Sequence, residues 1–188
     1  MKKILLFCLL SSAGMFAQEN VTLVTGKTSE VRLDLLSPIA FGKANVSYEY
    51  FTGSDFSYGI TLSFAFGKKT DEDFENGYRK NLPQYEVIPY VRYKLSKSEL
   101  SYYFAEVFAS ANSGKVREIV RIDQGGTAAY VIDESTYADL ALGGGLGYKF
   151  YMRQWAVEFA VGAGYNLLNT DQSPDVITRV GLNLGYRF

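Results

Sequence analysis

Large apolar residues alternate with small or polar residues along most of the chain, with a period of two positions. Between Asp55 and Gly67, every second residue from Phe56 to Phe66 is apolar, and the residues between them are small or carry a hydroxyl group. Residues two apart in a β-strand point to the same side of the sheet. The pattern therefore predicts a strand with one apolar face and one polar face.

The same alternation predicts eight strands. We place them at residues 31–35, 43–50, 55–67, 85–95, 103–109, 139–150, 155–166 and 179–188. The connections at 52–54, 96–100 and 151–154 are short, whereas those at 37–42, 67–84, 112–136 and 167–176 are longer. Short turns at one end and long loops at the other are typical of barrels that span the bacterial outer membrane. The predicted fold class is all-β: an eight-stranded antiparallel transmembrane up-and-down β-barrel, with short periplasmic turns and longer extracellular loops.

Aromatic residues make up 15% of the chain and gather near both ends of the predicted strands. Near the long loops they are Phe64, Phe66, Tyr85 and Tyr165, and near the short turns they are Tyr48, Tyr50, Phe56, Tyr58, Tyr93, Tyr103, Tyr148, Phe150, Trp155, Tyr186 and Phe188. Two such levels match aromatic girdles at the two bilayer interfaces. A soluble β-sandwich or lipocalin-like barrel is the alternative, and it would turn its apolar face inward. We favour the membrane, because the apolar face ends in an aromatic C-terminal strand.

The polar faces of the predicted strands carry nearly equal numbers of basic and acidic residues. Side chains fill the lumen of an eight-stranded barrel, and buried charges must be paired or hydrogen-bonded. We therefore expect a charge network that plugs the lumen. Its predicted members are Arg32, Asp34, Lys43, Glu49, Glu86, Arg92, Lys94, Glu106, Asp139, Lys149, Glu158, Arg179 and Arg187. Large inward residues are expected to occupy the space that glycines leave on the last three strands.

The N-terminus has the pattern of a secretory signal peptide. Two lysines precede an apolar run at residues 4–10, and small residues follow. We place the cleavage after Ala17, so that residues 1–17 form the signal peptide and residues 18–188 the outer-membrane barrel domain.

Composition excludes several classes of function. The chain has 188 residues, and its 19 basic and 20 acidic residues give a net charge of −1, so no basic excess attracts nucleic acid. It contains no His, which removes His-dependent catalytic triads and His-ligated metal sites. The single cysteine, Cys8, follows Phe7, which is too large for a lipidation motif. We therefore expect neither a disulfide nor a lipid anchor in the mature domain.

Two motifs resemble ligand sites but have simpler interpretations. The glycine-rich run at 142–147 could suggest a phosphate-binding loop, but strand alternation follows it where such a loop needs a helix. The acidic run at 71–76 lacks the spacing of a calcium-binding loop, and we interpret it as a solvated loop. We predict that the protein is not an enzyme and has no catalytic, cofactor or metal site.

The last strand carries a family resemblance. From Val180 to Phe188, apolar or aromatic residues alternate with small or polar ones, and the chain ends on phenylalanine. This resembles the C-terminal strand that the outer-membrane assembly machinery recognises, with Leu182, Leu184, Tyr186 and Phe188 as the assembly signal. With the signal peptide and the eight strands, the chain resembles the small eight-stranded outer-membrane β-barrel proteins of Gram-negative bacteria, the OmpA/OmpX-like class, from about residue 28 onward. One departure is Asn183, where that class often has glycine.

The resemblance implies a monomer in the cell outer membrane, surrounded by its lipid. Two functional hypotheses follow. The first is a non-enzymatic barrel with a side-chain-filled lumen, which supports the envelope or binds a surface ligand through the long loops at 67–84 and 112–136. The second is a small pore, or a lumen pocket for an apolar ligand. It rests on four large residues that alternation places inward: Ile88, Tyr90, Phe104 and Phe108.

Overall fold

The structure is a computed structural model that describes residues 26–66, 68–78, 80–96, 98–124, 127–169 and 172–188. The predicted signal peptide at 1–17, with Cys8, lies outside the described residues, so its cleavage stays a prediction.

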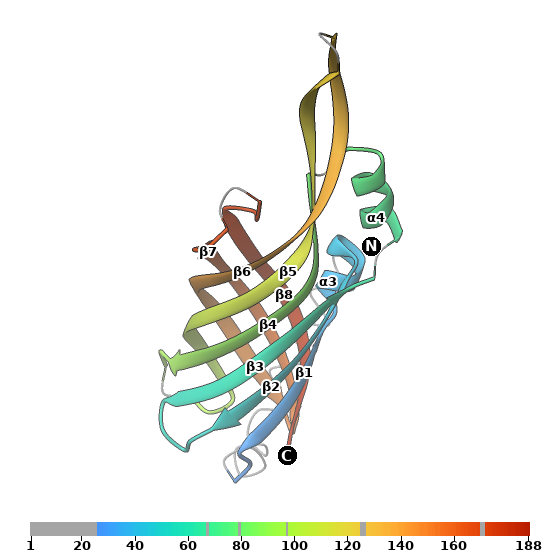
Figure 1. The fold of residues 1–188 in the computed structure, drawn as a ribbon. Coiled ribbons are helices and arrows are strands. Elements are labelled where there is room, and N and C mark those ends of the chain that lie inside the picture. Colours follow the sequence, from blue (N-terminus) through green and yellow to red (C-terminus); the bar gives the residue numbers. More distant parts are fainter. Residues whose placement is uncertain (1–25, 67, 79, 97, 125–126, 170–171) are drawn as a thin grey trace.

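Eight antiparallel strands form a closed barrel in which each strand pairs with its neighbours in sequence (Figure 1). They are β1 (Ser29–Asp34), β2 (Lys43–Phe51), β3 (Phe56–Ala65), β4 (Asn81–Lys94), β5 (Ser101–Gln124), β6 (Thr127–Met152), β7 (Trp155–Asn166) and β8 (Val176–Arg187). The last strand closes the barrel by pairing with the first, with Leu184 opposite Leu33. The predicted fold class, an eight-stranded up-and-down antiparallel barrel, is confirmed.

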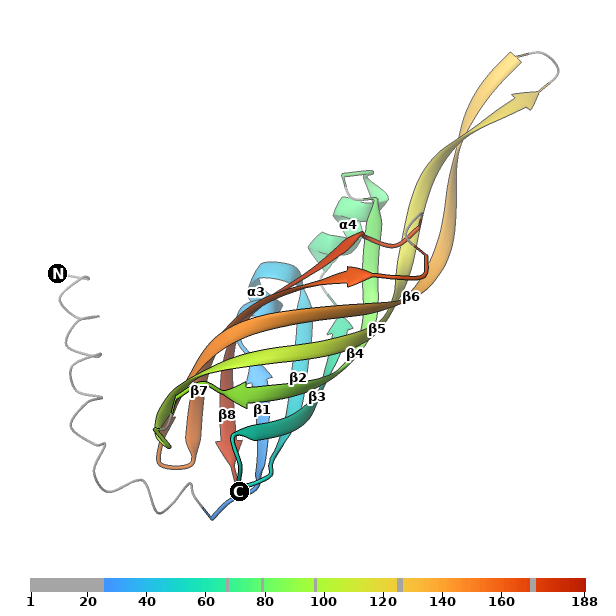
Figure 2. The same ribbon diagram turned by 90° about the vertical axis from the view of Figure 1, so that its left-hand side faces the viewer.

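Two short helices lie at the long-loop end, namely α3 (Leu36–Phe41) and α4 (Lys68–Glu75) (Figure 2). Helix α4 corrects the interpretation of the acidic run at 71–76 as a solvated loop. The segment lacks strand alternation, and Asp71 in its first turn is favourably placed at the positive end of the helix dipole. No described helix has the length and apolar character needed to cross a membrane.

The predicted long loop at 112–136 was wrong, because β5 and β6 continue through it as a two-stranded hairpin. Their pairing is continuous from Ser101 opposite Phe150 to Gln124 opposite Thr127. The hairpin extends beyond the rest of the barrel at the long-loop end (Figures 1 and 2). Water surrounds both faces of such a projection, so its sequence need not alternate between apolar and polar residues. The adjacent Ile119 and Val120 break the alternation for this reason, and periodicity missed the strands.

The outer wall of the barrel is apolar and the charged side chains lie inside, which is the inverse of a water-soluble barrel. Aromatic pairs mark both ends of this wall. Near the short turns the ring centroids lie 5.0 Å apart for Phe56–Tyr93, 4.8 Å for Tyr103–Tyr148 and 5.2 Å for Trp155–Tyr186, and near the long loops they lie 6.3 Å apart for Phe64–Tyr85. An apolar band between two aromatic girdles is the outer surface of a barrel that spans the outer membrane. The protein therefore belongs in the cell outer membrane, as predicted.

Three residues of the predicted assembly signal, Leu182, Leu184 and Tyr186, lie along the outer face of β8, and Phe188 directly follows the strand. Tyr186 packs against Trp155 on β7, while Leu184 lies opposite both Val157 and Leu33. The backbone of Phe188 extends the pairing with β1, because its amide donates to the Ser29 carbonyl at 2.8 Å. This terminal strand therefore contributes to barrel closure as well as to the outer wall.

Candidate functional site

The thirteen charged residues that we assigned to the lumen all lie on the inner face of the barrel or its rim. Nine are buried and four are half-buried. The buried ones are Arg32, Asp34, Glu49, Arg92, Glu106, Asp139, Lys149, Glu158 and Arg187, and the half-buried ones are Lys43, Glu86, Lys94 and Arg179. They do not form a single network, because five of them belong to a central cluster, six others have local partners, and Lys43 and Glu86 form no ion pair with a described residue.

Six residues form what we call the ion-pair cluster: Glu30, Arg32, Glu49, Arg92, Lys149 and Glu158. The Lys149 Nζ atom lies 2.8 Å from Glu30 Oε1, 2.8 Å from Glu49 Oε2 and 3.1 Å from Glu158 Oε2. Arg32 pairs with Glu49 and lies 3.1 Å from Glu30 Oε1. Three cations thus balance three carboxylates in a space closed to solvent.

Arg92 links the cluster to the aromatic side chains around it. Its guanidinium contacts Glu158 Oε2 at 2.7 Å and Glu49 Oε2 at 3.0 Å, and its Nε atom donates to Glu106 Oε2 at 2.7 Å. The guanidinium carbon lies 4.6 Å from the centre of the Tyr90 ring and 4.2 Å from that of Phe104. Charge pairing and cation–π contact both stabilise a guanidinium that has left water.

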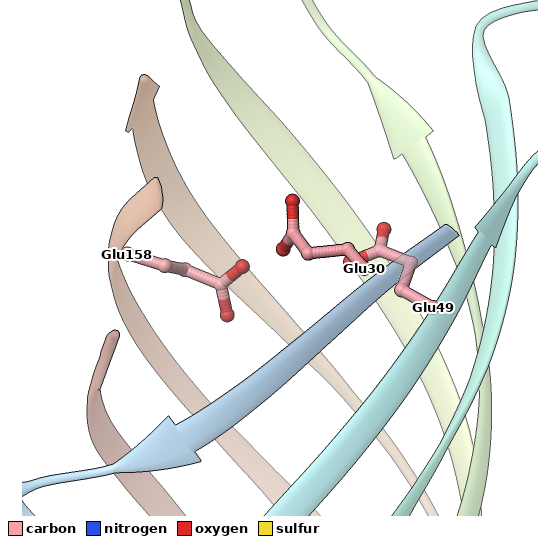
Figure 3. Close-up of side chains that lie close together, drawn as sticks. All are labelled: Glu30, Glu49 and Glu158. Atoms are coloured by element: carbon pink, nitrogen blue, oxygen red, sulfur yellow. The ribbon is translucent and has the colours of Figure 1, made fainter. Parts of the chain in front are cut away.

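The three glutamates of the cluster converge as the ligands of a metal ion would (Figure 3). Carboxylate oxygens of Glu30, Glu49 and Glu158 lie within 4.8 Å of one another. The ammonium of Lys149 already contacts all three groups, and Arg32 and Arg92 complete the charge balance. A metal ion would have to displace a cation, so these residues do not fit a metal centre.

Sequence reasoning missed Glu30, which is fully buried. We began the first strand at Val31, although extending the alternation by one step from Arg32 places Glu30 inward. It also missed Tyr151, assigned to a short turn, whose hydroxyl lies 2.5 Å from Glu30 Oε2. The two residues close the short-turn side of the cluster together, so strand ends have to be extended until the pattern breaks.

Charged residues outside the cluster fix the strand ends. Asp34 accepts from the Leu36 amide at 2.9 Å, and Asp139 accepts from the Leu168 amide at 2.9 Å, which anchors the connections after β1 and β7.

The remaining charged residues differ in their partners. Lys94 pairs with Glu99 at 2.6 Å. The guanidinium of Arg187 lies over the Phe51 ring, and that of Arg179 contacts Glu106 at 2.5 Å. Lys43 and Glu86 form no ion pair with any described residue.

Large inward side chains lie over glycines on the neighbouring strand. A Cβ atom on Gly59 would lie 2.2 Å from the Tyr90 ring, on Gly143 it would lie 2.3 Å from the Phe108 ring, and on Gly147 it would lie 2.2 Å from the Phe104 ring. Each pair is also a cross-strand pair, so the ring covers the adjacent strand. The rings and the ion-pair cluster together occupy the central lumen, and we refer to this filling as the plug.

Arg117 braces the β5–β6 hairpin at its base. Its guanidinium donates to the Phe74 carbonyl of α4 at 2.8 Å and to the Glu75 carbonyl at 2.5 Å, and lies 5.0 Å from the centre of the Phe74 ring. Its Nε atom also donates to Glu134 on the opposite strand at 3.0 Å. The hairpin is therefore held to helix α4 as well as to the barrel.

Beyond Arg117, neither backbone edge of the hairpin pairs with another strand of the described residues. Pairing of β4 with β5 reaches Val116, and one further bond joins the Arg117 amide to the Lys80 carbonyl at 2.9 Å. Within the described residues, only β5 pairs with the part of β6 that precedes Leu140. Three side chains on one face of this projection are strongly exposed: Ile119 at 74%, Tyr130 at 71% and Ile132 at 56%.

Comparisons with solved structures find barrels of the same architecture. The N-terminal β-barrel domain of Pseudomonas aeruginosa OprF matches with a TM-score of 0.50 and 11% identity, over 86% of this chain and 98% of that one. Neisserial surface protein A (NspA) matches with a TM-score of 0.49 and 12% identity, over 86% and 95%. Ail, the attachment invasion locus protein of Yersinia pestis, matches with a TM-score of 0.43 and 12% identity, over 86% and 94%. At such identity the likeness to OprF supports the fold alone.

The comparison with curated proteins gives no match. A family model with the description "Protein of unknown function (DUF3575)" matches residues 19–186, which is nearly the whole chain.

Proposed function

The chain belongs to the DUF3575 family, and we propose that it is a non-enzymatic outer-membrane barrel with a closed lumen, which binds a protein partner at the cell surface through the β5–β6 hairpin. The free edges of this braced hairpin carry the proposal. Lipid surrounds the barrel, and the assembly machinery recognises its last strand.

The plug supports a closed, non-catalytic lumen. Each carboxylate of the ion-pair cluster contacts a cation, so none is available as a general base. The rings of Tyr90, Phe104 and Phe108 are buried and fill the adjacent space. An open pore at this level would need both the cluster and the rings to move.

The backbone edge of the hairpin supports a partner that adds a β-strand. The Leu140 carbonyl on β6 accepts from the Leu167 amide at 2.9 Å on the outer side. Backbone groups alternate in direction along a strand, and the β5–β6 pairing runs without a register shift. Even-numbered residues such as Tyr130 and Ile132 therefore direct their amides and carbonyls away from β5. An exposed edge of this kind is a template for a further strand.

The fixed base of the hairpin also lowers the entropic cost of binding. Because Arg117 fixes its base against α4 and Glu134, less conformational entropy is lost when a partner binds. The exposed Ile119, Tyr130 and Ile132 supply apolar contact area on the same face.

The test separates backbone recognition from side-chain recognition. Full-length barrel in lipid nanodiscs is used to select binders from a displayed library of twelve-residue peptides. Ile132→Thr keeps the backbone amide at the edge of the hairpin, whereas Ile132→Pro removes this amide without breaking a hydrogen bond between β5 and β6. We expect the selected peptides to bind the wild type and Ile132→Thr but not Ile132→Pro. Retention of binding by Ile132→Pro would contradict strand addition.

A second variant tests the alternative role in envelope support. Residues 119–132 are replaced by a two-residue turn, which leaves the barrel intact. Loss of peptide binding with unchanged detergent resistance of the cells supports surface binding. Unchanged peptide binding with detergent-sensitive cells favours an envelope-structural protein.

A further inference from the structure

On the long-loop side of the plug the lumen contains a cavity of about 310 Å³. Its lining extends from Pro83, Tyr137 and Pro174 at the rim of the barrel to Arg92 and Phe104 at the plug. This volume is at the lower end of the range for small-molecule sites. The cavity is therefore large enough for one small solute and is closed on the side of the short turns.

Polar atoms without partners gather around this cavity. Among the described residues, three buried side-chain atoms in its lining have no hydrogen-bond partner: Asn45 Oδ1, the Tyr137 hydroxyl and Arg32 Nε. Tyr137 is only 3% exposed. Buried polar groups in folded proteins are nearly always hydrogen-bonded. Arg32 belongs to the plug, so Asn45 Oδ1 and the Tyr137 hydroxyl are the two that a polar occupant would satisfy, whereas an apolar one would not.

The acceptor atom of Asn45 is positioned by its own amide group. The Asn45 Nδ2 atom donates to Asp34 Oδ2 at 3.0 Å, at the end of β1, and to Ser37 Oγ at 2.9 Å, in the first turn of α3. With the amino group held there, the carbonyl oxygen is left without a partner. Asn45 thus offers the cavity a fixed acceptor.

Two opposite charges in the lining are not neutralised by neighbours. Lys43 and Glu86 are half-buried, and neither forms an ion pair with a described residue. Glu86 only accepts a hydrogen bond from Ser110 at 2.9 Å. Other charges in the lining, such as Arg92 and Arg179, are paired. Asp34 also lines the cavity without an ion pair, but its carboxylate is held by hydrogen bonds from the Leu36 amide at 2.9 Å and from Asn45 Nδ2 at 3.0 Å. Lys43 and Glu86 are therefore the cation and the anion that remain for the contents of the cavity.

The register places the acceptors in one row. Asn45 lies opposite Ser63, and Ser63 lies opposite Glu86, so three oxygen-bearing side chains cross β2, β3 and β4 side by side. Lys43 lies one inward position further along β2. A solute spanning these positions meets acceptors on one side and an ammonium group on the other.

We propose that this cavity binds a small zwitterion of amino-acid to dipeptide size, which enters from the long-loop end. Its ammonium group contacts Glu86 and Asn45 Oδ1, and its carboxylate contacts Lys43. The Tyr137 hydroxyl supplies a further hydrogen bond. A neutral sugar would satisfy the orphan polar atoms but would leave Lys43 and Glu86 without counter-charges. This site is separate from the hairpin.

The first experiment uses ligands that differ in charge. Glycylglycine, N-acetylglycine, glycinamide and glucose are titrated into full-length barrel in nanodiscs, and binding is measured by saturation-transfer NMR. We expect glycylglycine to bind about tenfold or more tightly than either singly charged probe, because each lacks one charge-assisted contact. If glycylglycine does not bind, the cavity holds water only and the proposal is overturned. Binding of glucose as tight as that of glycylglycine, or tighter, also overturns it.

Variants locate the binding. Lys43→Met and Glu86→Gln keep side-chain size and should each weaken glycylglycine about tenfold. Tyr137→Phe removes only the orphan hydroxyl and should weaken it less. Lys94→Met is the matched control, because it removes the same charge at the opposite end of the lumen and should leave affinity unchanged. Heat-modifiable gel mobility verifies the folding of each variant. If Lys43→Met and Glu86→Gln each fold and bind glycylglycine with the affinity of the wild type, the assignment is overturned.

Discussion

The ammonium of Lys149 on β6 donates a hydrogen bond of 2.8 Å to the carboxylate of Glu30 on β1, although the two residues are 119 positions apart in the chain. The bond crosses the lumen between strands that do not pair with each other. Ion pairs of this kind add side-chain links to the backbone hydrogen bonds of the wall. The interior of the barrel therefore contributes to its closure.

Removing one charge from the ion-pair cluster should destabilise the barrel strongly. Lys149→Met leaves three buried carboxylates against two cations, and an uncompensated buried charge typically costs about 3–5 kcal/mol. Arg92→Ala and Glu106→Ala should act in the same direction and exceed any loop substitution. The measurement is a urea unfolding titration in lipid vesicles followed by the fluorescence of Trp155.

A double variant provides the control for this prediction. Lys149→Met combined with Glu30→Gln restores the charge balance, so its loss of stability should be smaller than the two single losses added together. Additive losses would show that the two side chains do not interact in the folded barrel.

Glycine substitutions on β6 should separate lumen-facing from lipid-facing positions. An added methyl group at Gly147 meets the ring of Phe104, which is 1% exposed and cannot move aside, while at Gly144 the nearest atom lies 3.4 Å away. Gly147→Ala should therefore cost about 1–3 kcal/mol, as overpacking does, and Gly144→Ala should be nearly neutral. The same unfolding titration measures both. Equal effects would mean that the strand is rotated from its assigned register.

Arginine substitutions on the outer wall should report membrane depth. Trp155 and Tyr165 mark the two girdles on β7, and ten residues at about 3.4 Å each and a tilt of about 45° span roughly 24 Å of bilayer. Val161 lies near the middle of this span and is 58% exposed. Val161→Arg should cost about 2–4 kcal/mol, whereas Leu142→Arg, opposite Tyr165, should cost only about 0–1 kcal/mol. Equal costs would contradict this depth assignment.

The sequence predicted the wall better than the contacts inside it. Alternation assigned inward residues such as Arg92 and Lys149 correctly, because the lipid on one side of the wall enforces a period of two. It could not show which cation meets which carboxylate, since that depends on strand stagger and on side chains from distant strands. The hairpin beyond Val116 was missed because no lipid imposes the pattern there. The orphan Tyr137 hydroxyl is a three-dimensional property with no signal in the sequence.

Phe188 should matter more for assembly than for stability. Its side chain is 52% exposed, and its backbone bonds to Ser29 persist in Phe188→Ala. Insertion in cells, measured as the heat-modifiable fraction in outer membranes, should fall for Phe188→Ala, while refolding into detergent stays near the wild type. Val180→Ala, on the same exposed face of β8 but away from the C-terminus, is the control. Equal losses in both assays would indicate packing instead of recognition by the assembly machinery.

The plug should prevent ion flow through the wild-type barrel. Arg92 lies at its centre, between the carboxylates of Glu49, Glu106 and Glu158 and the rings of Tyr90 and Phe104. An ion passing this level would have to separate these pairs without water to replace them. We expect no stable unitary steps from wild-type protein in planar bilayers, and brief openings from Arg92→Ala, with Lys80→Ala on the exposed surface as a silent control. Reproducible single-channel steps from pure wild-type protein would show that the plug moves and would favour a transport role.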